Sequence, residues 1–154
     1  MASSLYGRSI SLHADQVKTG LPLGYSHGYG VTFEVGAFSD LRLAFDLATW
    51  KNVEKLPSVS VAIHRLSYGL KGIYSLPLNG YGLIPFCTAS LGLEELEQEI
   101  VGITKTAKTS DFYFQGSVGV EYGAFESWIP YFEMAQDWGL YQSTHMSLGL
   151  RYLL

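Results

Sequence analysis

The chain has 154 residues and a net charge of −4, and only 16% of its residues are charged although 47% are hydrophobic. Soluble domains carry roughly 25% charged residues, so this chain is poorly equipped to keep a soluble surface hydrated. It has no basic block of the kind that binds nucleic acid. No stretch reaches the ~20 apolar residues of a transmembrane helix, so a helical membrane protein is not expected.

Cys87 is the only cysteine, which excludes an intrachain disulfide and a CxxC metal or redox site. The first four residues have neither the basic region nor the apolar region of a signal peptide. Because an outer-membrane protein needs such a segment in its precursor, we expect the chain to be a mature region that carries an initiating Met.

Apolar and polar residues alternate with a period of two along most of the chain, and turn residues separate the alternating segments. In the fourth segment Val59, Val61 and Ile63 have the opposite parity to the apolar residues at 66, 68 and 70. The sequence therefore predicts a bulge or a late strand start near His64 and Arg65. Eight segments are predicted, at 6–14, 29–36, 41–48, 59–71, 86–93, 112–122, 131–138 and 145–154.

The predicted connections alternate in length. Short ones fall at 37–40, 76–82 and 123–127, and longer ones at 15–28, 50–58, 94–111 and, less clearly, 139–143. Short turns at one end and long loops at the other are typical of outer-membrane barrels. The prediction is one all-β domain over residues 1–154, an eight-stranded antiparallel up-and-down transmembrane β-barrel.

Alternation alone also fits a soluble barrel that carries lipid, so the composition of the polar face decides between the two. That face consists mostly of Gly, Ser, Thr and Ala, which suit a narrow interior better than a surface in water. The other face is almost wholly apolar, and aromatic residues near the segment ends fit the girdles of a membrane barrel. The candidate girdle residues are Tyr6, Tyr29, Tyr122, Trp128, Trp138 and Tyr152.

Charged residues of both signs occur on the inward parity of six segments. Two hypotheses follow: a structural set of ion pairs that plugs the barrel, or a gated polar pathway whose pairs exchange to pass small solutes. The plug is preferred, because an eight-stranded barrel has an interior that side chains just fill. The candidate lumen residues are Glu34, Arg42, Asp46, Lys71, Glu121, Glu133, Asp137 and Arg151.

His13 and His145 also lie on the inward face. Ser147 and His145, with Asp137 or Glu133, could supply the nucleophile, base and acid of a hydrolase. No nucleophile elbow or other local signature supports that arrangement, so catalysis is not the preferred hypothesis. There is no HxxxH spacing and no cysteine pair, and we expect neither a metal nor another cofactor.

The third long connection contains an acidic run, Glu94–Ile100, followed by Lys105 and Lys108. Such a run could bind a divalent cation or a partner at the cell surface. The preferred interpretation is a solvated face, or a strand that continues beyond the membrane.

The stretch from Ser39 to Asn52, S-D-L-R-L-A-F-D-L-A-T-W-K-N, resembles the third strand of small OmpA-like or opacity-type outer-membrane barrels, above all those of the neisserial surface protein A type. Pro85-Phe86, 119–122 (G-V-E-Y) and 147–151 (S-L-G-L-R) look like further landmarks of that group. The resemblance implies a filled polar lumen, extracellular loops that act as an adhesin or antigen surface, and no catalytic residues to transfer. Arg42, Asp46 and Arg151 match its lumen positions.

The lipid A deacylase barrels are similar in size, but their His-x-Ser-Asn motif on the seventh strand is absent, because this chain reads E-M-A-Q-D at 133–137. We therefore expect a non-enzymatic, monomeric surface protein of the bacterial outer membrane. Its expected partners are the lipid bilayer, lipopolysaccharide or detergent, and a surface ligand bound by 15–28, 50–58 and 94–111. A narrow gated pore and an outer-leaflet lipid-modifying enzyme stay open as alternatives.

Overall fold

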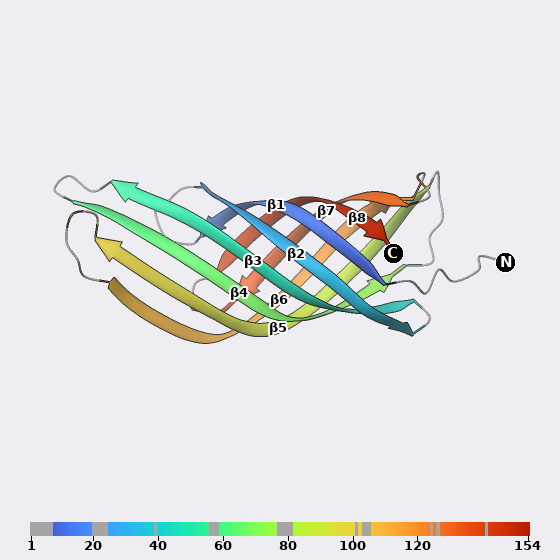
Figure 1. Cartoon of the computed structure of the whole chain (residues 1–154), viewed down its shortest axis with the longest axis horizontal. Coiled ribbons are helices and arrows are strands. Elements are labelled where there is room, and N and C mark those ends of the chain that lie inside the picture. Colours follow the sequence, from blue (N-terminus) through green and yellow to red (C-terminus); the bar gives the residue numbers. More distant parts are fainter. Residues whose placement is uncertain are drawn as a thin grey trace.

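The computed structural model describes residues 8–19, 25–38, 40–55, 59–76, 82–100, 102, 106–123, 125, 127–140 and 142–154, without the side chains of 19, 37, 38, 54 and 55. The described residues form a closed antiparallel barrel in which each strand pairs with its sequence neighbours and β1 also pairs with β8 (Figure 1). This confirms the predicted fold class. The eight strands are β1 (Ser9–Thr19), β2 (Tyr25–Phe38), β3 (Leu41–Lys55), β4 (Ser60–Ser75), β5 (Leu83–Ile100), β6 (Thr106–Tyr122), β7 (Trp128–Trp138) and β8 (Ser143–Leu153).

The described residues contain no helix with the length and hydropathy needed to cross a membrane.

Small residues and rings interlock inside the barrel, which explains why the inward face is rich in glycine. A Cβ added at Gly92 would lie 2.8 Å from Tyr113 Cε1, and one at Gly149 would lie 2.2 Å from Tyr131 Cζ. Each ring therefore occupies the space that a neighbouring strand leaves free. Side chains fill most of the narrow interior in this way.

Both forms of the prediction near His64 and Arg65, a bulge or a late strand start, are wrong. β4 begins at Ser60 and pairs with β3 and β5 in continuous register through these residues. Among the described residues the ladder shifts register in β2, between Glu34 and Gly36. Val61 and Ile63 keep the inward parity of Arg65, because the interior itself becomes apolar at this height. There Ile63 packs with Val17, Trp50 and Leu96.

The predicted long loops are mostly strand. β1 runs to Thr19 and β2 starts at Tyr25, so most of 15–28 is paired, and β3 runs to Lys55 within 50–58. Likewise β5 continues to Ile100 and β6 begins at Thr106, which leaves 101–105 of the range 94–111 between them. The strands continue past the predicted ends because the ladders stay hydrogen-bonded after the side-chain pattern changes.

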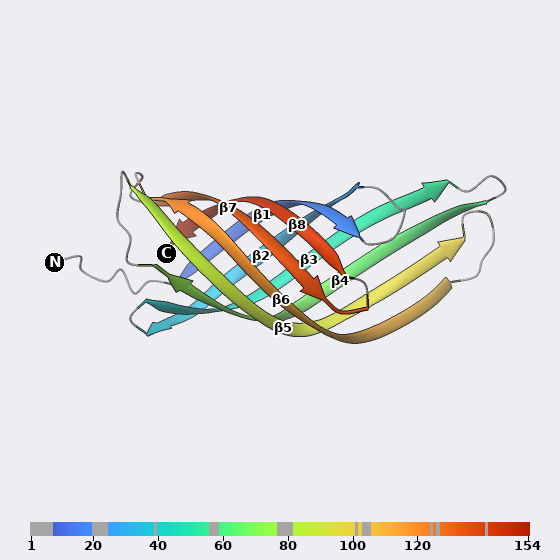
Figure 2. The ribbon, with the colours of Figure 1, turned by 180° about the vertical axis from the view of Figure 1, so that it is seen from behind.

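The wall of the barrel is uneven in height. The hairpins β3–β4 and β5–β6 project at one end well beyond β1, β2, β7 and β8 (Figures 1 and 2). Together β3–β6 form a four-stranded sheet that rises from one side of the barrel, which we call the protruding sheet. The β2–β3, β4–β5 and β6–β7 connections lie at the opposite end, and we call that the turn end.

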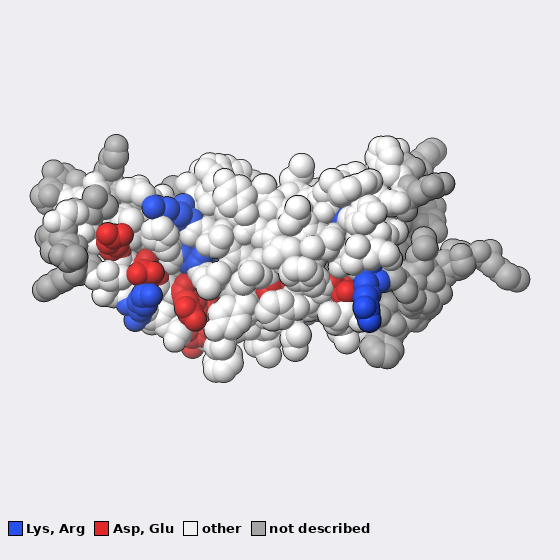
Figure 3. All heavy atoms as spheres, in the orientation of Figure 1, with Lys and Arg blue, Asp and Glu red and all other residues white. Residues whose placement is uncertain are grey.

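The outside of the barrel carries an apolar belt. Large apolar side chains stay exposed there, among them Leu70 at 69%, Leu148 at 70% and Val118 at 63%. The outward-facing positions of the belt include no Asp, Glu, Lys or Arg in the described residues, and Figure 3 shows the nearly uncharged middle of one face. The belt comprises 10–14, 29–35, 41–47, 66–74, 83–93, 112–122, 128–138 and 146–152.

Above the belt the outward face of the strands becomes charged and the inward face becomes apolar. On β5, Glu95, Glu97 and Glu99 follow Leu91 and Leu93 on the outward parity, while Leu96 is buried inside. On β3, Lys51 likewise follows Leu47 on the outward parity, and Trp50 is buried inside. The polarity of the outer wall thus changes at one height around the protruding sheet.

Candidate functional site: the polar lumen

A ring of two arginines and two glutamates closes the lumen toward the turn end. Arg42 donates to Glu34 at 3.0 Å and to Glu121 at 2.8 Å. Arg151 donates to the same two carboxylates, at 3.2 Å to Glu34 and 2.8 Å to Glu121. The four side chains come from β2, β3, β6 and β8 and are at least half-buried. Their charges cancel, and each guanidinium links both carboxylates.

A lysine pair fills the middle of the lumen. Lys71 Nζ lies 2.8 Å from Glu133 Oε1 and 2.9 Å from Oε2, and both side chains are buried. The hydroxyl of Ser117 donates to the same carboxylate, and Thr88 contacts Ser117. This satisfies the buried glutamate with a cation and hydroxyls, as a buried charge requires.

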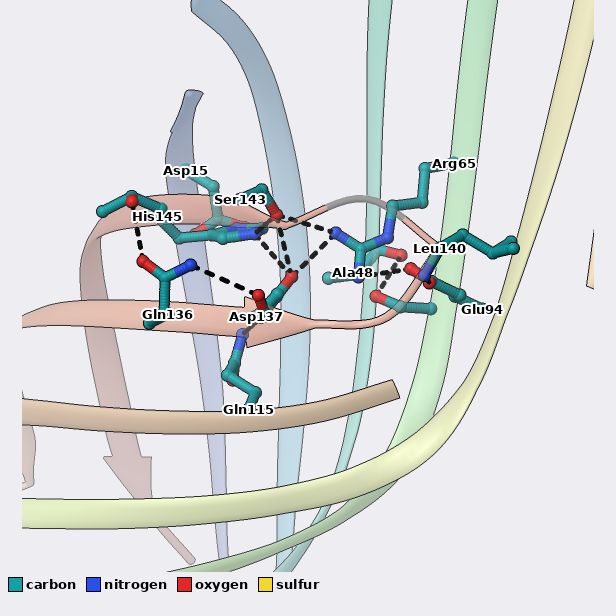
Figure 4. Close-up of polar contacts among 12 residues, drawn as sticks. Asp15, Ala48, Arg65, Glu94, Gln115, Gln136, Asp137, Leu140, Ser143 and His145 are labelled. Carbon is teal, nitrogen blue, oxygen red and sulfur yellow. Dashed lines mark hydrogen bonds and ion pairs between the residues drawn. The ribbon is translucent and has the colours of Figure 1, made fainter. Parts of the chain in front are cut away.

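The largest polar cluster lies beneath the protruding sheet (Figure 4). Arg65 is 3% exposed and bridges Glu94 at 2.6 Å and Asp137 at 2.8 Å. Asp137 also contacts His145 Nε2 at 2.7 Å and accepts a bond from Gln115 at 2.7 Å. The backbone N–H of Leu140 donates to Glu94.

An apolar lid covers this cluster. Val17, Trp50, Ile63 and Leu96 pack together inside the barrel, with Leu140 against them. The guanidinium of Arg65 lies 6.0 Å from the ring centre of Trp50, so the same arginine contacts the apolar lid and forms the ion pairs. The polar interior is therefore closed by apolar side chains at one end and by the arginine ring at the other.

Two small cavities lie between these layers. One cavity, of about 30 Å³, lies beside His13, Asp15, Asp46 and His145, and another of about 20 Å³ lies between Lys71 and the arginine ring. A water molecule needs roughly 10–15 Å³ of such space, so each cavity has room for one or two waters. Neither cavity is large enough to form an aqueous channel through the lumen.

The structure places all eight predicted lumen residues inside the barrel. Seven of them take part in ion pairs between a Lys or Arg and a carboxylate, and Asp46 accepts a hydrogen bond from the hydroxyl of Thr32. The structure also buries Arg65, Glu94 and Asp15 inside the barrel, and the sequence prediction does not include them. The side-chain pattern predicts a bulge or late strand start at Arg65 and long loops at Glu94 and Asp15. Only the inward parity of these residues points to the lumen.

Five of the six predicted girdle residues are described by the structure, and they lie on the outside near the edges of the belt. Trp128 and Tyr152 are in contact at the turn end, with ring centres 4.5 Å apart. Trp138 stacks on Phe114 at 5.6 Å near the other edge. Tyr29 at 69% and Tyr122 at 41% are exposed, whereas Tyr6 lies outside the described residues.

The hypothetical hydrolase residues do not form a relay. Ser143, which is not among the residues predicted from the sequence, and Asp137 both face Nε2 of His145, at 2.8 and 2.7 Å. A relay needs the acid on one ring nitrogen and the nucleophile on the other. Ser147 is buried in the lumen as well. Among the described residues, no group of three or more His, Cys, Asp or Glu side chains is arranged to hold a metal ion.

Comparison with solved structures finds the same fold in small outer-membrane barrels. The chain is similar to neisserial surface protein A (NspA), with 19% identity, 96% of this chain and 97% of that chain covered, and a TM-score of 0.78. It is similar to the attachment invasion locus protein Ail of Yersinia pestis, with 13% identity, 97% and 99% coverage and a TM-score of 0.66.

The outer membrane enzyme PagL is a third similar structure, with 17% identity, 94% and 99% coverage and a TM-score of 0.62. No family model and no curated protein sequence matches the chain. The structural likenesses confirm the expected fold, a small eight-stranded antiparallel barrel of the kind that these proteins have. They do not distinguish a binding protein from an enzyme, because PagL has this fold too.

Proposed function

We propose that this chain is an integral protein of the bacterial outer membrane that binds a surface partner through its protruding sheet and catalyses no reaction. The change of polarity along the strands carries the membrane part of this proposal. An apolar surface this large is not tolerated in water on a soluble monomer. A lipid-facing belt flanked by aromatic residues, with charges only beyond its edges, is what a bilayer requires.

The protruding sheet supports a binding role. β7 pairs with β6 only from Phe114 onward, so the described segment 106–113 of β6 is paired with β5 and has no strand on its other side. Residues 106–112 are all exposed. An open strand edge offers backbone N–H and C=O groups to an extended segment of a partner.

The negative charge on the outer wall of the protruding sheet disfavours a polyanionic partner. A structure of Ail contains the heparin analogue sucrose octasulfate. In this chain the outward residues of β5 above the belt are Glu95, Glu97 and Glu99, and Lys108 is engaged with Glu97 at 3.6 Å. Such a surface repels a polyanion, so we expect an extended protein segment as the partner, rather than a sulfated glycan.

Removing the top of the β5–β6 hairpin tests this function. The variant deletes residues 97–108 and joins Leu96 to Thr109 through an Asn-Gly turn, which leaves all β6–β7 pairs intact. Fluorescent liposomes carrying the refolded full barrel should bind cultured epithelial cells, and the shortened barrel should not. A control that changes Glu95 and Glu99 to Gln should retain binding. Equal binding by the shortened and full barrels would contradict the proposed role of the sheet.

The two alternatives have less support. A pore needs a continuous path, whereas the lumen holds cavities of about 30 and 20 Å³ between ion-paired layers. A lipid-modifying enzyme needs its catalytic groups on the lipid-facing wall, whereas Asp137, Ser143 and His145 are buried inside. Incubation of lipid A with the refolded barrel, followed by mass spectrometry, should show no change in its acyl chains.

A further inference from the structure

The lumen contains more negative than positive side chains. Its described residues include seven carboxylates but four Lys or Arg groups. The carboxylates are Asp15, Glu34, Asp46, Glu94, Glu121, Glu133 and Asp137, and the cations are Arg42, Arg65, Lys71 and Arg151. The arginine ring is balanced by itself. The whole imbalance therefore lies in the compartment between that ring and the apolar lid.

This compartment holds five carboxylates against Arg65 and Lys71. The cavity in this compartment measures about 30 Å³, which is room for one or two water molecules and not for three hydrated counterions that would neutralise the excess of three. Uncompensated charge in such surroundings costs several kcal/mol per group, by order of magnitude. A set of ligands for a metal cation is also absent among the described residues.

Two imidazoles are placed to supply the missing positive charge. His145 Nε2 lies 2.7 Å from Asp137, and His13 Nε2 lies 3.4 Å from Asp15. The other nitrogen of His13 lies 3.3 Å from the hydroxyl of Tyr131. Asp15 is 8% exposed, and its Oδ1 has no hydrogen-bond partner.

The charged groups around both rings are mainly carboxylates. His13 interacts with Asp46 of β3, Lys71 of β4 and Glu133 of β7, in addition to Asp15. His145 faces Asp15 of β1 and Asp137 of β7, with Arg65 of β4 bound to the same Asp137 carboxylate. Lys71 and Arg65 are each already paired with a glutamate.

We propose that this compartment is a proton-binding site, in which His13 and His145 are both cationic at neutral pH. Each proton comes from solvent and adds to the lone pair of the ring nitrogen that is unprotonated in neutral imidazole. The two protons reduce the excess of negative charge from three to one. Asp46, which is bonded to the hydroxyl of Thr32 and has no Lys or Arg partner among the described residues, carries the remainder.

The proposal predicts opposite signs for two similar substitutions. Asp46→Asn removes the last excess charge and keeps an oxygen for the Thr32 hydroxyl, so it should raise the urea midpoint of the refolded barrel at pH 8. Glu133→Gln leaves Lys71 unpaired and should lower the midpoint. Because the folded barrel holds two protons that the unfolded chain releases, its unfolding constant should rise about 100-fold per pH unit above pH 7.5. The double variant His13→Gln with His145→Gln should lose this dependence.

The charge state of the rings is measured directly by ¹⁵N NMR of the histidine side chains in micelles at pH 7.5, where an exposed imidazole is mostly neutral. Shifts of doubly protonated rings for His13 and His145, with His27 as an internal reference, support the proposal. Neutral rings overturn it, and so does an Asp46→Asn variant that is destabilised like Glu133→Gln. The proposal is also overturned if the urea midpoint differs between sodium and choline salts at the same ionic strength but does not change with pH. That result would assign the missing positive charge to bound metal cations.

Discussion

Replacing Arg151 with Met should be among the most damaging single changes in the lumen. Arg151 is 7% exposed and donates to Glu34 at 3.2 Å and to Glu121 at 2.8 Å. Met fills much of the same volume but leaves two buried carboxylates with Arg42 as their one shared cation. Removing one partner of a buried ion pair costs about 3–5 kcal/mol, and we expect a loss of this size in the free energy of unfolding.

The double variant Arg151→Met with Glu121→Gln separates charge from packing. It leaves the pair of Arg42 and Glu34, at 3.0 Å, with balanced charge. It should therefore be more stable than Arg151→Met alone, with a coupling energy of about 1–3 kcal/mol in a double-mutant cycle. Stability is measured by reversible urea unfolding in micelles, followed by tryptophan fluorescence and by gel mobility without heating. A loss below about 1 kcal/mol for Arg151→Met, or additive effects in the cycle, would refute the account of the ring.

Three further predictions concern packing, lipid contact and conduction. Gly92→Ala should destabilise the barrel by about 1–3 kcal/mol in the same urea assay, because the added Cβ would lie 2.2 Å from the Tyr68 carbonyl oxygen. Gly72→Ala is the control and should be nearly neutral, because the nearest atom to its added Cβ lies 3.8 Å away. Leu70→Arg, in the middle of the belt, should cost about 2–4 kcal/mol in lipid vesicles, and Ser110→Arg, above the belt, about 0–1 kcal/mol, so equal costs would contradict the position of the belt. In planar bilayers the wild-type barrel should give no steady single-channel conductance, and regular conductance steps would contradict a filled lumen.

The barrel could be predicted from the sequence because its two environments repeat with a period of two. Where the outward side chains are apolar and the inward ones are polar, as from Leu41 to Leu47, the alternation reveals both the strand and its orientation. Where the outside becomes water and the inside becomes apolar, as at Ile63 and Leu96, the same parity has the opposite polarity. The predicted strands therefore ended too early.

The partners within the lumen could not be predicted in the same way. Arg65 and Asp137 are 72 residues apart and belong to β4 and β7, with two strands between them in the barrel wall. Which inward charges meet depends on the register of every intervening pair of strands, and alternation does not contain that information. The inward parity of Asp15 and Glu94 favours a place in the lumen. Both residues lie in polar stretches, and those stretches predict loops instead.

The central claim is that lipid or detergent forms the outer solvent of this barrel. The measurement that tests it most directly is refolding from urea into lipid vesicles and, in parallel, into buffer without lipid. Each sample is examined by far-UV circular dichroism and by electrophoresis with and without heating. The account predicts a β spectrum and a heat-modifiable band only with lipid. A chain that folds and stays soluble in buffer alone would contradict it.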